Sequence, residues 1–438
     1  MKFIFADSLD YVDPRYDFIE DRSPSDREPY WDDVYPHELL GYAPYDGILV
    51  SRAIIGGNKV SGKYTDAQAM RFRRIGAREF LRFREEDYPG SVVFGDCGAF
   101  TYHLMEYPPY TSEEMVDFYG DGQFTHGCSI DHIIFDYVED EQAEDIQPER
   151  LEENRRRFEI TSANAEEFLQ QSKRIGNSFT PMGVVQGWSP ASMAEAALRL
   201  KKMGYQYIAI GGMVPLRAPQ IKNVLTAIRE AVGNDLNMHI LGFAKADEIH
   251  EFGDLNITSF DTTSPLLRAF KDSNRNYYAL RPEGGIDYYS AIRIPQAIEN
   301  NGLKNLAKQG VYSQEDLQNR EATALKTLRA FDRGEADVQD TLTDVMAYTA
   351  PLAVGRDEGH SDKDKRKLEG LRERYQRTLE DRPWKTCTCQ VCRAVGVETI
   401  IFRASNRNKR RGIHNLQAYK KHIGLIGKAN NHAQNSDL

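Results

Sequence analysis

The chain has 438 residues, of which 40% are hydrophobic and 28% charged, as in globular proteins that bury a substantial core. Its formal net charge of −10 excludes a uniformly basic nucleic-acid-binding protein but is compatible with a local basic patch. No apolar run approaches the length of a membrane span, so no membrane association is expected. Three of the five cysteines are clustered, which favours metal binding in a reducing cytoplasm over a disulfide framework.

Eight short apolar runs predict β-strands, and most of them are followed by a helical pattern. The predicted strands cover residues 1–8, 47–51, 91–96, part of 127–137, 181–186, 207–211, 238–243 and 257–261. Helical patterns cover residues 65–86, a segment from 111, and residues 150–175, 189–203 and 217–232. Residues 9–46 are rich in Asp, Tyr and Pro without a regular period, and we expect them to form an insertion after the first strand.

This alternation of strands and helices predicts a (β/α)8 TIM barrel, an α/β fold. Nearly continuous apolar strands are typical of parallel sheets that are covered on both faces. Eight such units also match the usual size of a barrel. A doubly wound sheet is the alternative, but no Gly-x-Gly-x-x-Gly follows the first strand. We therefore expect a barrel domain at residues 1–290 and, at 291–438, a helical extension with a zinc site and a basic segment.

A cysteine cluster near the end of the chain gives the most specific chemical signal. Cys387, Cys389 and Cys392 form a C-x-C-x-x-C pattern, and His414 follows them. Three thiolates and one imidazole complete a tetrahedral ligand set with no open position, which predicts a structural zinc site. Five basic residues lie near this site, and we expect them to contact a phosphate backbone rather than form a merely solvated face. They are Arg403, Arg407, Lys409, Arg410 and Arg411.

Polar side chains occur at the carboxyl ends of several predicted strands, where barrel enzymes hold their active sites. The candidates are Asp96 and Phe100, Asp131 or Asp136, Gln186 and Gly187, Gly211 and Gly212, and Asp261. Three aspartates predict carboxylate chemistry, in which one forms a covalent intermediate, one transfers a proton and one accepts hydrogen bonds from a heterocycle. Taken alone, each aspartate is also compatible with capping the next helix.

These motifs resemble those of the tRNA-guanine transglycosylase family, over residues 90–415. The segment from Gly95 to Phe100 (GDCGAF) is similar to the family's D-S-G-G-F-Q, and Gln186-Gly187 is similar to its V-Q-G turn. Gly211-Gly212 is similar to the G-G-L turn, and the SFD sequence ending at Asp261 is similar to F-D-C. The resemblance implies a (β/α)8 barrel, a zinc insertion of three Cys and one His, and replacement of a guanine in a polynucleotide. It also implies that Asp261 is the nucleophile and Asp96 the general acid/base.

The chain departs from the tRNA enzymes at several of these motifs. Cys97, Ala99 and Thr101 stand where those enzymes have Ser, Gly and Gln, and the residues after Asp261 do not follow the usual C-x-x-P-T-R. These features are closer to the DpdA branch, which inserts 7-deazaguanines into DNA in bacteria and phages. The branch implies DNA as the macromolecular partner and 7-cyano-7-deazaguanine as the inserted base.

Two aspartates compete for the role of recognising the base. The geometry of a strand end favours Asp136, whereas the sequence SIDH at residues 129–132 is closer to the DpdA branch and favours Asp131. The resemblance implies that Gln186 and the backbone of Gly211 and Gly212 hold the purine face that guanine and 7-deazaguanine share.

Three alternatives fit parts of the sequence. A tRNA-guanine transglycosylase of the queuosine or archaeosine pathway would keep the mechanism and change the substrate. A non-catalytic nucleic-acid-binding homologue would keep the barrel and the zinc, although the presence of both Asp96 and Asp261 argues against it. A barrel hydrolase or lyase acting on a small molecule would make the basic segment purely structural. Partner proteins of a DNA-modification system, and a homodimer like that of the family's tRNA enzymes, are both compatible with the sequence.

Overall fold

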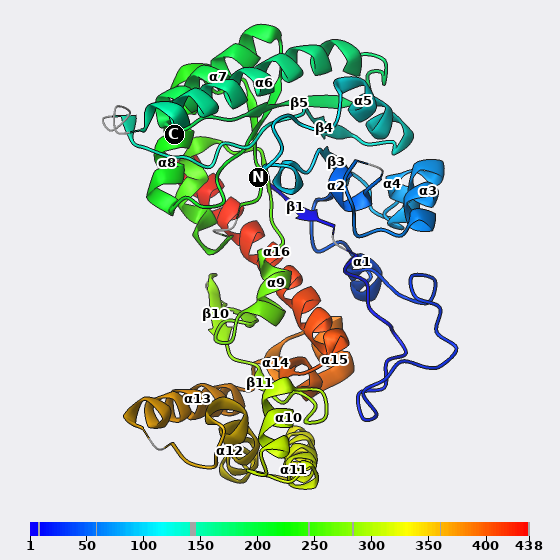
Figure 1. The fold of residues 1–438 in the computed structure, drawn as a ribbon, viewed down its shortest axis with the longest axis vertical. Coiled ribbons are helices and arrows are strands. Elements are labelled where there is room, and N and C mark those ends of the chain that lie inside the picture. The colour runs from blue at the N-terminus through cyan, green and yellow to red at the C-terminus, as the bar shows by residue number, and fades with distance from the viewer. Residues whose placement is uncertain are drawn as a thin grey trace. The chain divides into compact units, whose positions relative to one another are not determined.

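The computed structural model describes residues 1–436 apart from 8, 58, 141–145, 244, 245, 283 and 360. Eight parallel strands close into a barrel in chain order, and β8 pairs with β1 through Lys2↔Ser259 and Ile4↔Asp261. The strands are β1 (Lys2–Ala6), β2 (Gly47–Ser51), β3 (Val92–Asp96), β4 (His126–Cys128), β5 (Thr180–Val185), β6 (Tyr207–Ile210), β7 (Asn237–Ile240) and β8 (Ser259–Asp261). The predicted (β/α)8 fold is confirmed, and closure of the sheet excludes the doubly wound alternative (Figure 1).

Helices connect the barrel strands, and three of them begin at a Ser or Thr that caps them. The connecting helices are α2 (Arg52–Ile55), α3 (Asp66–Ile75), α4 (Ala77–Phe80), η1 (Ala99–Thr101), α5 (Ser112–Asp121), α6 (Pro148–Ser172), α7 (Pro190–Met203), α8 (Ala218–Val232) and η3 (Ala246–Leu255). After β8, α9 (Ser264–Lys271) begins the part of the chain that belongs to the second unit. The side chains of Thr65, Thr111 and Ser189 each accept a hydrogen bond from a first-turn N–H group, of α3, α5 and α7 respectively. The predicted single helix at 65–86 is divided, because Gly76 adopts a φ of +84° and ends α3.

The barrel interior is filled by alternate residues of the strands, as the two-residue period of a β-strand requires. The apolar members are Ile4, Leu49, Val92, Phe94, Cys128, Met182, Val184, Tyr207 and Ala209. On the outer side, α5 approaches β3 closely, and a Cβ atom added to Gly95 would lie 2.2 Å from the ring of Tyr119. A glycine at this strand position therefore sets the distance between helix and sheet.

The fourth strand is shorter than the sequence predicts. β4 ends at Cys128, and the chain from 129 to 139 continues without regular strand pairing. Ser129 keeps it beside β5, because its N–H donates to Met182 O at 2.8 Å and its Oγ accepts from Val184 N at 3.0 Å. The segment that carries both candidate base-recognising aspartates therefore leaves the barrel as an extended loop.

The chain divides into two compact units. The barrel unit comprises Met1–Leu9, Tyr45–Ser264 and the chain from Ile426 onward. The second unit comprises Asp10–Pro44 and Pro265–Leu425. The predicted boundary at residue 290 and the placement of the insertion at 9–46 in the barrel domain therefore differ from the structure.

Specific contacts explain why these two segments belong to the second unit. Tyr278 N donates to Asn415 Oδ1 at 3.0 Å, which joins the segment after β8 to the last helix. Asp21, in the early segment, forms ion pairs with Arg403 and Arg407. Both contacts join residues far apart in the sequence, so composition alone could not place the boundary.

The second unit is mainly helical. It contains α1 (Pro36–Leu40), β9 (Tyr277–Leu280), β10 (Ile286–Tyr289), β11 (Ile292–Arg293), α10 (Asn301–Lys308), α11 (Gln314–Arg333), α12 (Val338–Val354), α13 (Asp362–Asp381), α14 (Pro383–Thr386), α15 (Gln390–Val395), η4 (Gly396–Ile400), β12 (Ile401–Phe402) and most of α16 (Ser405–Ser436). Its core combines Leu328, Phe331, Tyr348, Trp384 and Ile413. None of the helices in the described part of the chain has the length and apolar character to cross a membrane.

Candidate active site and metal centre

The candidate catalytic carboxylates lie at one end of the barrel. Asp96 is the last residue of β3, Asp261 is the last residue of β8, and Asp131 follows β4 by three residues. Because all eight strands are parallel, their carboxyl ends share one face of the barrel. Asp131 and Asp261 are also close enough to Asp96 for their negative charges to act on it.

Asp131 is buried, and both of its carboxylate oxygens are hydrogen-bonded. Oδ1 accepts from Cys97 Sγ at 3.1 Å, and Oδ2 accepts from Gln186 Nε2 at 2.6 Å. Tyr102 OH lies 3.0 Å from both the Cys97 sulfur and the main-chain oxygen of Asp131. Burial raises the pKa of Asp131, although the hydrogen bonds from Cys97 and Gln186 oppose the shift.

Asp136 lies outside this cluster. It is half-buried, pairs with Arg150, and accepts a hydrogen bond from Asn154 Nδ2 at 3.0 Å, so its charge is neutralised on α6. Of the two aspartates that the sequence leaves in competition, the structure therefore joins Asp131 to Gln186 and to the candidate catalytic carboxylates Asp96 and Asp261.

Asp96 has an environment suited to proton transfer. Burial raises the pKa of Asp96 to about 7, and the negative charges of Asp131 and Asp261 act in the same direction. A hydrogen bond from the Gly98 backbone opposes this shift. A carboxyl group with a pKa near neutrality can both give and take a proton at physiological pH. Clustered like charges of this kind are typical of functional sites.

Asp261 is held by β7. It is 6% exposed, and its Oδ1 accepts from Gly242 N at 2.9 Å and from His239 Nε2 at 3.1 Å. A carboxylate only accepts hydrogen bonds, so Nε2 carries the proton and Nδ1 accepts from Ser259 Oγ at 2.6 Å. Tyr207 OH lies 2.6 Å from the same Ser259 oxygen and completes a chain of four side chains inside the barrel.

Sequence reasoning did not single out His239. It lies within an apolar run that was assigned only as a strand. β7 and β8 pair at His239↔Ser259, so the imidazole points to the same side of the sheet as Asp261 two residues later. A histidine at an inward position of an otherwise apolar barrel strand is the signal that could have identified it.

The predicted glycines fulfil different structural requirements. A Cβ atom on Gly211 would lie 2.3 Å from Gln186 Nε2, so glycine leaves room for the amide that binds Asp131. Gly212 has a φ of +74°, which favours glycine. A Cβ atom on Gly187 would lie 2.7 Å from Ser192 Oγ, so this residue permits the close approach of α7.

An aromatic pair lies on loops that follow β3 and β4. Phe100 is 52% exposed, Phe135 is 42% exposed, and their ring centroids are 5.9 Å apart. His103 contacts the edge of the Phe135 ring at a centroid distance of 5.3 Å. Exposed rings beside polar groups offer a surface on which a base can stack. Phe100 was predicted as a site residue, whereas Phe135 was not.

The four predicted metal ligands come together in the second unit. The ligand atoms of Cys387, Cys389, Cys392 and His414 all lie within 4.8 Å of one another. His414 Nδ1 lies 3.4 to 3.5 Å from the three sulfurs. Tetrahedral coordination at ordinary Zn–S and Zn–N lengths would place sulfur and nitrogen about 3.6 Å apart. The donor set therefore fits a single ion bound by four protein ligands.

The surroundings of the cluster fix the orientation of its imidazole. His414 Nε2 donates to Tyr278 O at 2.7 Å, which leaves Nδ1 free to bind a metal. The Tyr277 ring stacks on the imidazole at a centroid distance of 4.2 Å, and its hydroxyl lies 3.3 Å from Cys392 Sγ. These contacts provide the outer support that metal-binding histidines usually have.

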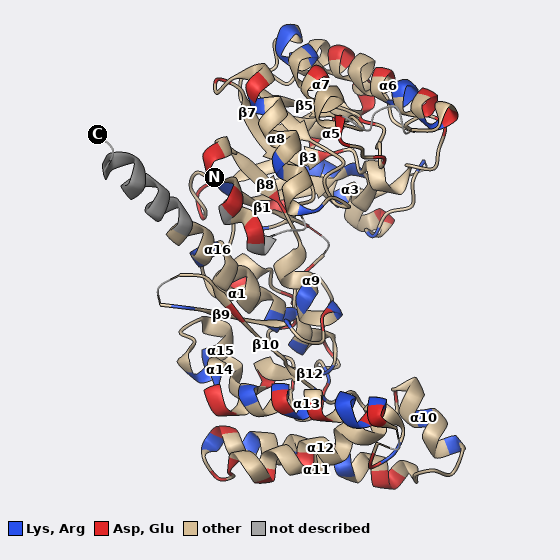
Figure 2. Cartoon of the chain, turned by 90° about the vertical axis from the view of Figure 1, so that its left-hand side faces the viewer, with Lys and Arg blue, Asp and Glu red and all other residues tan. Residues whose placement is uncertain are grey.

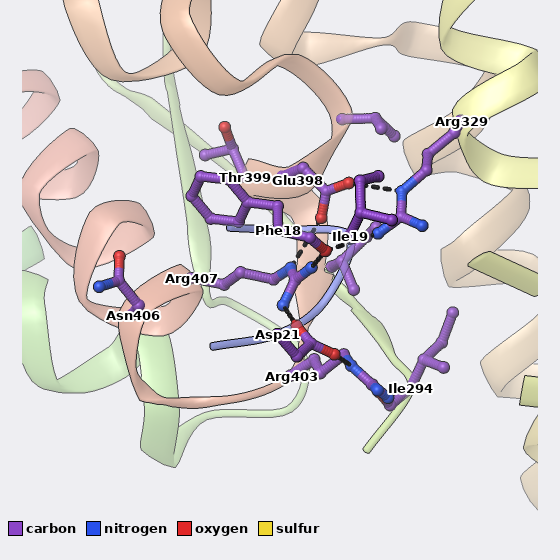
Figure 3. Close-up of polar contacts among 12 residues, drawn as sticks. Phe18, Ile19, Asp21, Ile294, Arg329, Glu398, Thr399, Arg403, Asn406 and Arg407 are labelled. Carbon is purple, nitrogen blue, oxygen red and sulfur yellow. Dashed lines mark hydrogen bonds and ion pairs between the residues drawn. The ribbon is translucent and has the colours of Figure 1, made fainter. Parts of the chain in front are cut away.

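The basic segment does not form the predicted phosphate-binding surface. Arg407 is fully buried, and it pairs with Asp21 and, at 2.7 Å, with Glu398 (Figure 3). Arg403 is 6% exposed and pairs with Asp21 and, at 2.6 Å, with Glu321. The side chain of Asp21 is 5% exposed, and its desolvation favours the neutral form, but these arginines hold the pKa of the carboxyl below the ordinary value.

The remaining members of the segment are also occupied within the second unit. Arg410 Nη2 donates to Asp13 O at 2.8 Å. Arg411 is fully buried and donates to Thr399 O at 3.1 Å. Lys409 donates to Tyr11 O at 3.1 Å. The prediction that this segment contacts a phosphate backbone is therefore wrong for the buried arginines, because the segment instead binds the early part of the chain.

The fold and the site together define a class of protein: a (β/α)8-barrel enzyme with three convergent carboxylates and a separate Cys3His centre. No family model matches the chain. A curated protein from Salmonella montevideo named DNA-guanine transglycosylase is 40% identical to it over 418 residues, which are 95% of each chain. The chain belongs to the DNA-guanine transglycosylase family. The prediction that it is an enzyme, a pentosyltransferase, is confirmed.

Proposed function

We propose that this enzyme exchanges guanine in DNA for a 7-deazaguanine through a covalent bond between Asp261 and the sugar. The observation that carries the proposal is the convergence of Asp96, Asp131 and Asp261 at one end of the barrel. The relative from Salmonella montevideo, by its name, acts on guanine in DNA. The motifs that resemble the DpdA branch support 7-cyano-7-deazaguanine as the incoming base.

The reaction consists of two displacements at C1′ of a deoxyguanosine that has left the base stack, since C1′ of a stacked nucleotide is not accessible. Asp261 attacks C1′, the bond to guanine N9 breaks, and the departing base takes a proton from Asp96. The incoming base then gives its N9 proton to Asp96 while N9 attacks C1′. The ester bond breaks, and the Asp261 carboxylate is restored.

His239 positions the nucleophile. Among the described residues, both hydrogen bonds to the Asp261 side chain end on Oδ1, which makes Oδ2 the attacking oxygen. His239 is in turn fixed through Ser259 and Tyr207. The carboxylate is thus oriented before the substrate binds, and this orientation lowers the entropic barrier to attack.

Asp131 and Gln186 recognise the base. Guanine and 7-deazaguanines share the same N–H donors on the pyrimidine edge, and an ionised carboxylate accepts from such donors. Asp131 is already oriented by Cys97 and Gln186. Phe100 and Phe135 follow the ends of β3 and β4 in the sequence, and their exposed rings provide a surface on which a flipped base can stack.

The ion of the Cys3His centre is zinc in this proposal. Three thiolates and an imidazole are typical zinc ligands, and they leave no coordination position for a substrate. When bound, the ion supplies a structural crosslink between α14, α15 and α16. Cys387 ends α14, Cys389 begins α15, and His414 lies in α16, so the ligand set draws on all three helices. Tyr278 O accepts from His414 Nε2 and so keeps the imidazole in the tautomer that binds a metal through Nδ1.

Incorporation of radiolabelled guanine and of labelled 7-cyano-7-deazaguanine tests the function. The label should enter duplex or single-stranded DNA and should not enter unmodified tRNA. Label in tRNA alone would preserve the chemistry and overturn the substrate. Label in neither polymer, with purified protein that binds DNA, would contradict base exchange by the isolated chain.

The raised pKa of Asp96 predicts a pH dependence. Below pH 7 the carboxyl is protonated and can supply the proton to the departing guanine; above pH 7 that form is lost. We expect kcat/KM for guanine exchange to fall above pH 7 by about tenfold per pH unit. The measurement is the initial rate of label incorporation at limiting DNA, from about pH 5.5 to about pH 9. This range extends on both sides of the pKa of Asp96.

Asp136→Asn is the matched control for this profile. Asp136 pairs with Arg150 away from the cluster, so its replacement should leave the fall above pH 7 unchanged. A wild-type profile that stays level across the alkaline range would contradict the acid role of Asp96.

A further inference from the structure

A pocket in the second unit has an unusual charge for a protein with net charge −10. The pocket has a volume of about 260 Å³ and is lined by β11, β12, α12 and α13. Three of its lining residues are basic: Arg293, Lys367 and Arg374. No aspartate or glutamate lines it among the described residues. Figure 2 shows that α13 carries both signs of charge, so the absence of acids is specific to the face that lines the pocket.

The basic groups of this pocket keep hydrogen-bonding capacity for a ligand. Arg374 Nε is buried and has no hydrogen-bond partner among the described residues. Lys367 Nζ donates to Ala353 O at 2.7 Å, which leaves two of its three protons available. The guanidinium group of Arg293 is exposed and makes no ion pair with a described acidic residue. Buried donors without partners carry a desolvation cost that an anionic ligand removes.

A second basic pocket differs because acidic residues line it together with the basic ones. In the barrel unit, Arg52, Lys59 and Arg73 line a cavity of about 490 Å³ together with Asp66 and Glu114. Lys59 Nζ already binds both oxygens of Glu114, at 2.6 and 2.8 Å. The charge of Lys59 is therefore paired within its pocket, whereas the described residues that line the pocket between α12 and α13 include no acid that could pair with its cations.

The character of the walls favours a phosphate group. Leu352, Leu371 and Phe402 contribute apolar surface beside the cations, and a lower local dielectric strengthens their attraction for an anion. The volume lies below the range of about 300–1,000 Å³ that is usual for drug-sized ligands. Exposed Arg293 and Lys367 lie at the surface, where a polymer strand can reach them.

We propose that Arg293, Lys367 and Arg374 bind a backbone phosphate of the DNA substrate. This inference rests on the proposed function for the identity of the polymer. This pocket takes the place of the basic segment at 403–411, whose arginines are buried, as the phosphate contact of the second unit. The contact is made to the sugar–phosphate backbone, so it contributes affinity and registration of the strand without sequence preference.

The test compares two double variants of α13. Lys367→Gln with Arg374→Gln removes two charges from the pocket, and Arg366→Gln with Arg372→Gln removes two from exposed positions that do not line it. Binding of fluorescent duplex and single-stranded DNA is measured by anisotropy at several salt concentrations. The pocket variant should bind about tenfold more weakly, with a salt slope smaller by about 1. The control should change by less than about twofold.

Each outcome decides the proposal. Equal losses in both double variants, or no loss in the pocket variant, would overturn it. Lys367→Gln alone changes one exposed side chain and should weaken binding by about threefold, which guards against misfolding of the double variant.

The test also separates the pocket from the proposed function. If wild-type protein incorporates label and the pocket variant binds DNA normally, the pocket proposal fails and the function stands. If wild-type protein binds DNA through the pocket but incorporates no label, the function fails and the pocket stands. If wild-type protein binds no DNA, both fail.

Discussion

Asp261→Asn protein is expected to bind DNA with unchanged affinity and to exchange bases at least about a thousandfold more slowly than the wild type. The amide has the shape of the carboxylate but lacks its charge, so it is a very weak nucleophile toward C1′. The surrounding contacts make a neutral replacement tolerable, because Gly242 N can still donate to the side-chain oxygen. The measurement is initial-rate incorporation of labelled guanine, together with DNA affinity.

A denaturing gel adds a direct view of the intermediate. Wild-type protein mixed with DNA and no incoming base should form a band of covalent protein–DNA adduct, and Asp261→Asn should not. Asp136→Asn is the control, because that side chain is paired on α6 and should give adduct in normal yield. Undiminished adduct from Asp261→Asn would remove Asp261 from the role of nucleophile.

Removal of the metal should unfold much of the second unit. Structural zinc sites contribute about 10 kcal/mol or more of apparent binding free energy at neutral pH, which is comparable to the whole stability of a typical domain. Cys389 and Cys392 are almost fully buried with His414, so loss of the ion leaves polar groups without a partner inside the core. Treatment with a strong chelator should lower the melting temperature and reduce helical circular dichroism.

Two cysteine variants make this result specific. Cys392→Ser should lower the bound metal from one ion per chain to a small fraction and should reproduce the effect of the chelator. Cys128→Ser is the control, because Cys128 lies in the barrel interior outside the ligand set and its variant should keep full metal content. Metal content is measured by elemental mass spectrometry. A stripped protein with an unchanged melting curve would contradict the structural role.

The sequence predicts the barrel well because its elements are determined locally. Each strand is a short apolar run, and Thr65 and Ser189 mark helix starts by the same chemistry that caps them in the structure. The candidate metal ligands are predictable for a similar reason: Cys387, Cys389 and Cys392 lie within six positions, and this spacing brings their sulfurs together.

Features that depend on distant pairing were not predictable. Arg403 and Asp21 are 382 positions apart, and a basic run gives no local sign that an acidic partner near the other end of the chain will bury it. The choice between Asp131 and Asp136 depended on where β4 ends and on Gln186, 55 positions after Asp131. The role of His239 becomes visible only when the register of β7 and β8 is known.

The discontinuity of the second unit has a consequence for the order in which the protein can be made. Residues 10–44 leave the ribosome before most of the barrel, yet Asp21 meets Arg403 and Arg407 only after nearly the whole chain has been synthesised. The carboxylate of Asp21 therefore stays without these arginine partners while the barrel segments before and after it in the sequence are synthesised. Long-range closure of this kind is slow, because loop entropy is lost before the contacts are gained. The residues from Ile426 onward belong to the barrel unit, so neither unit is complete until the last helix has been synthesised.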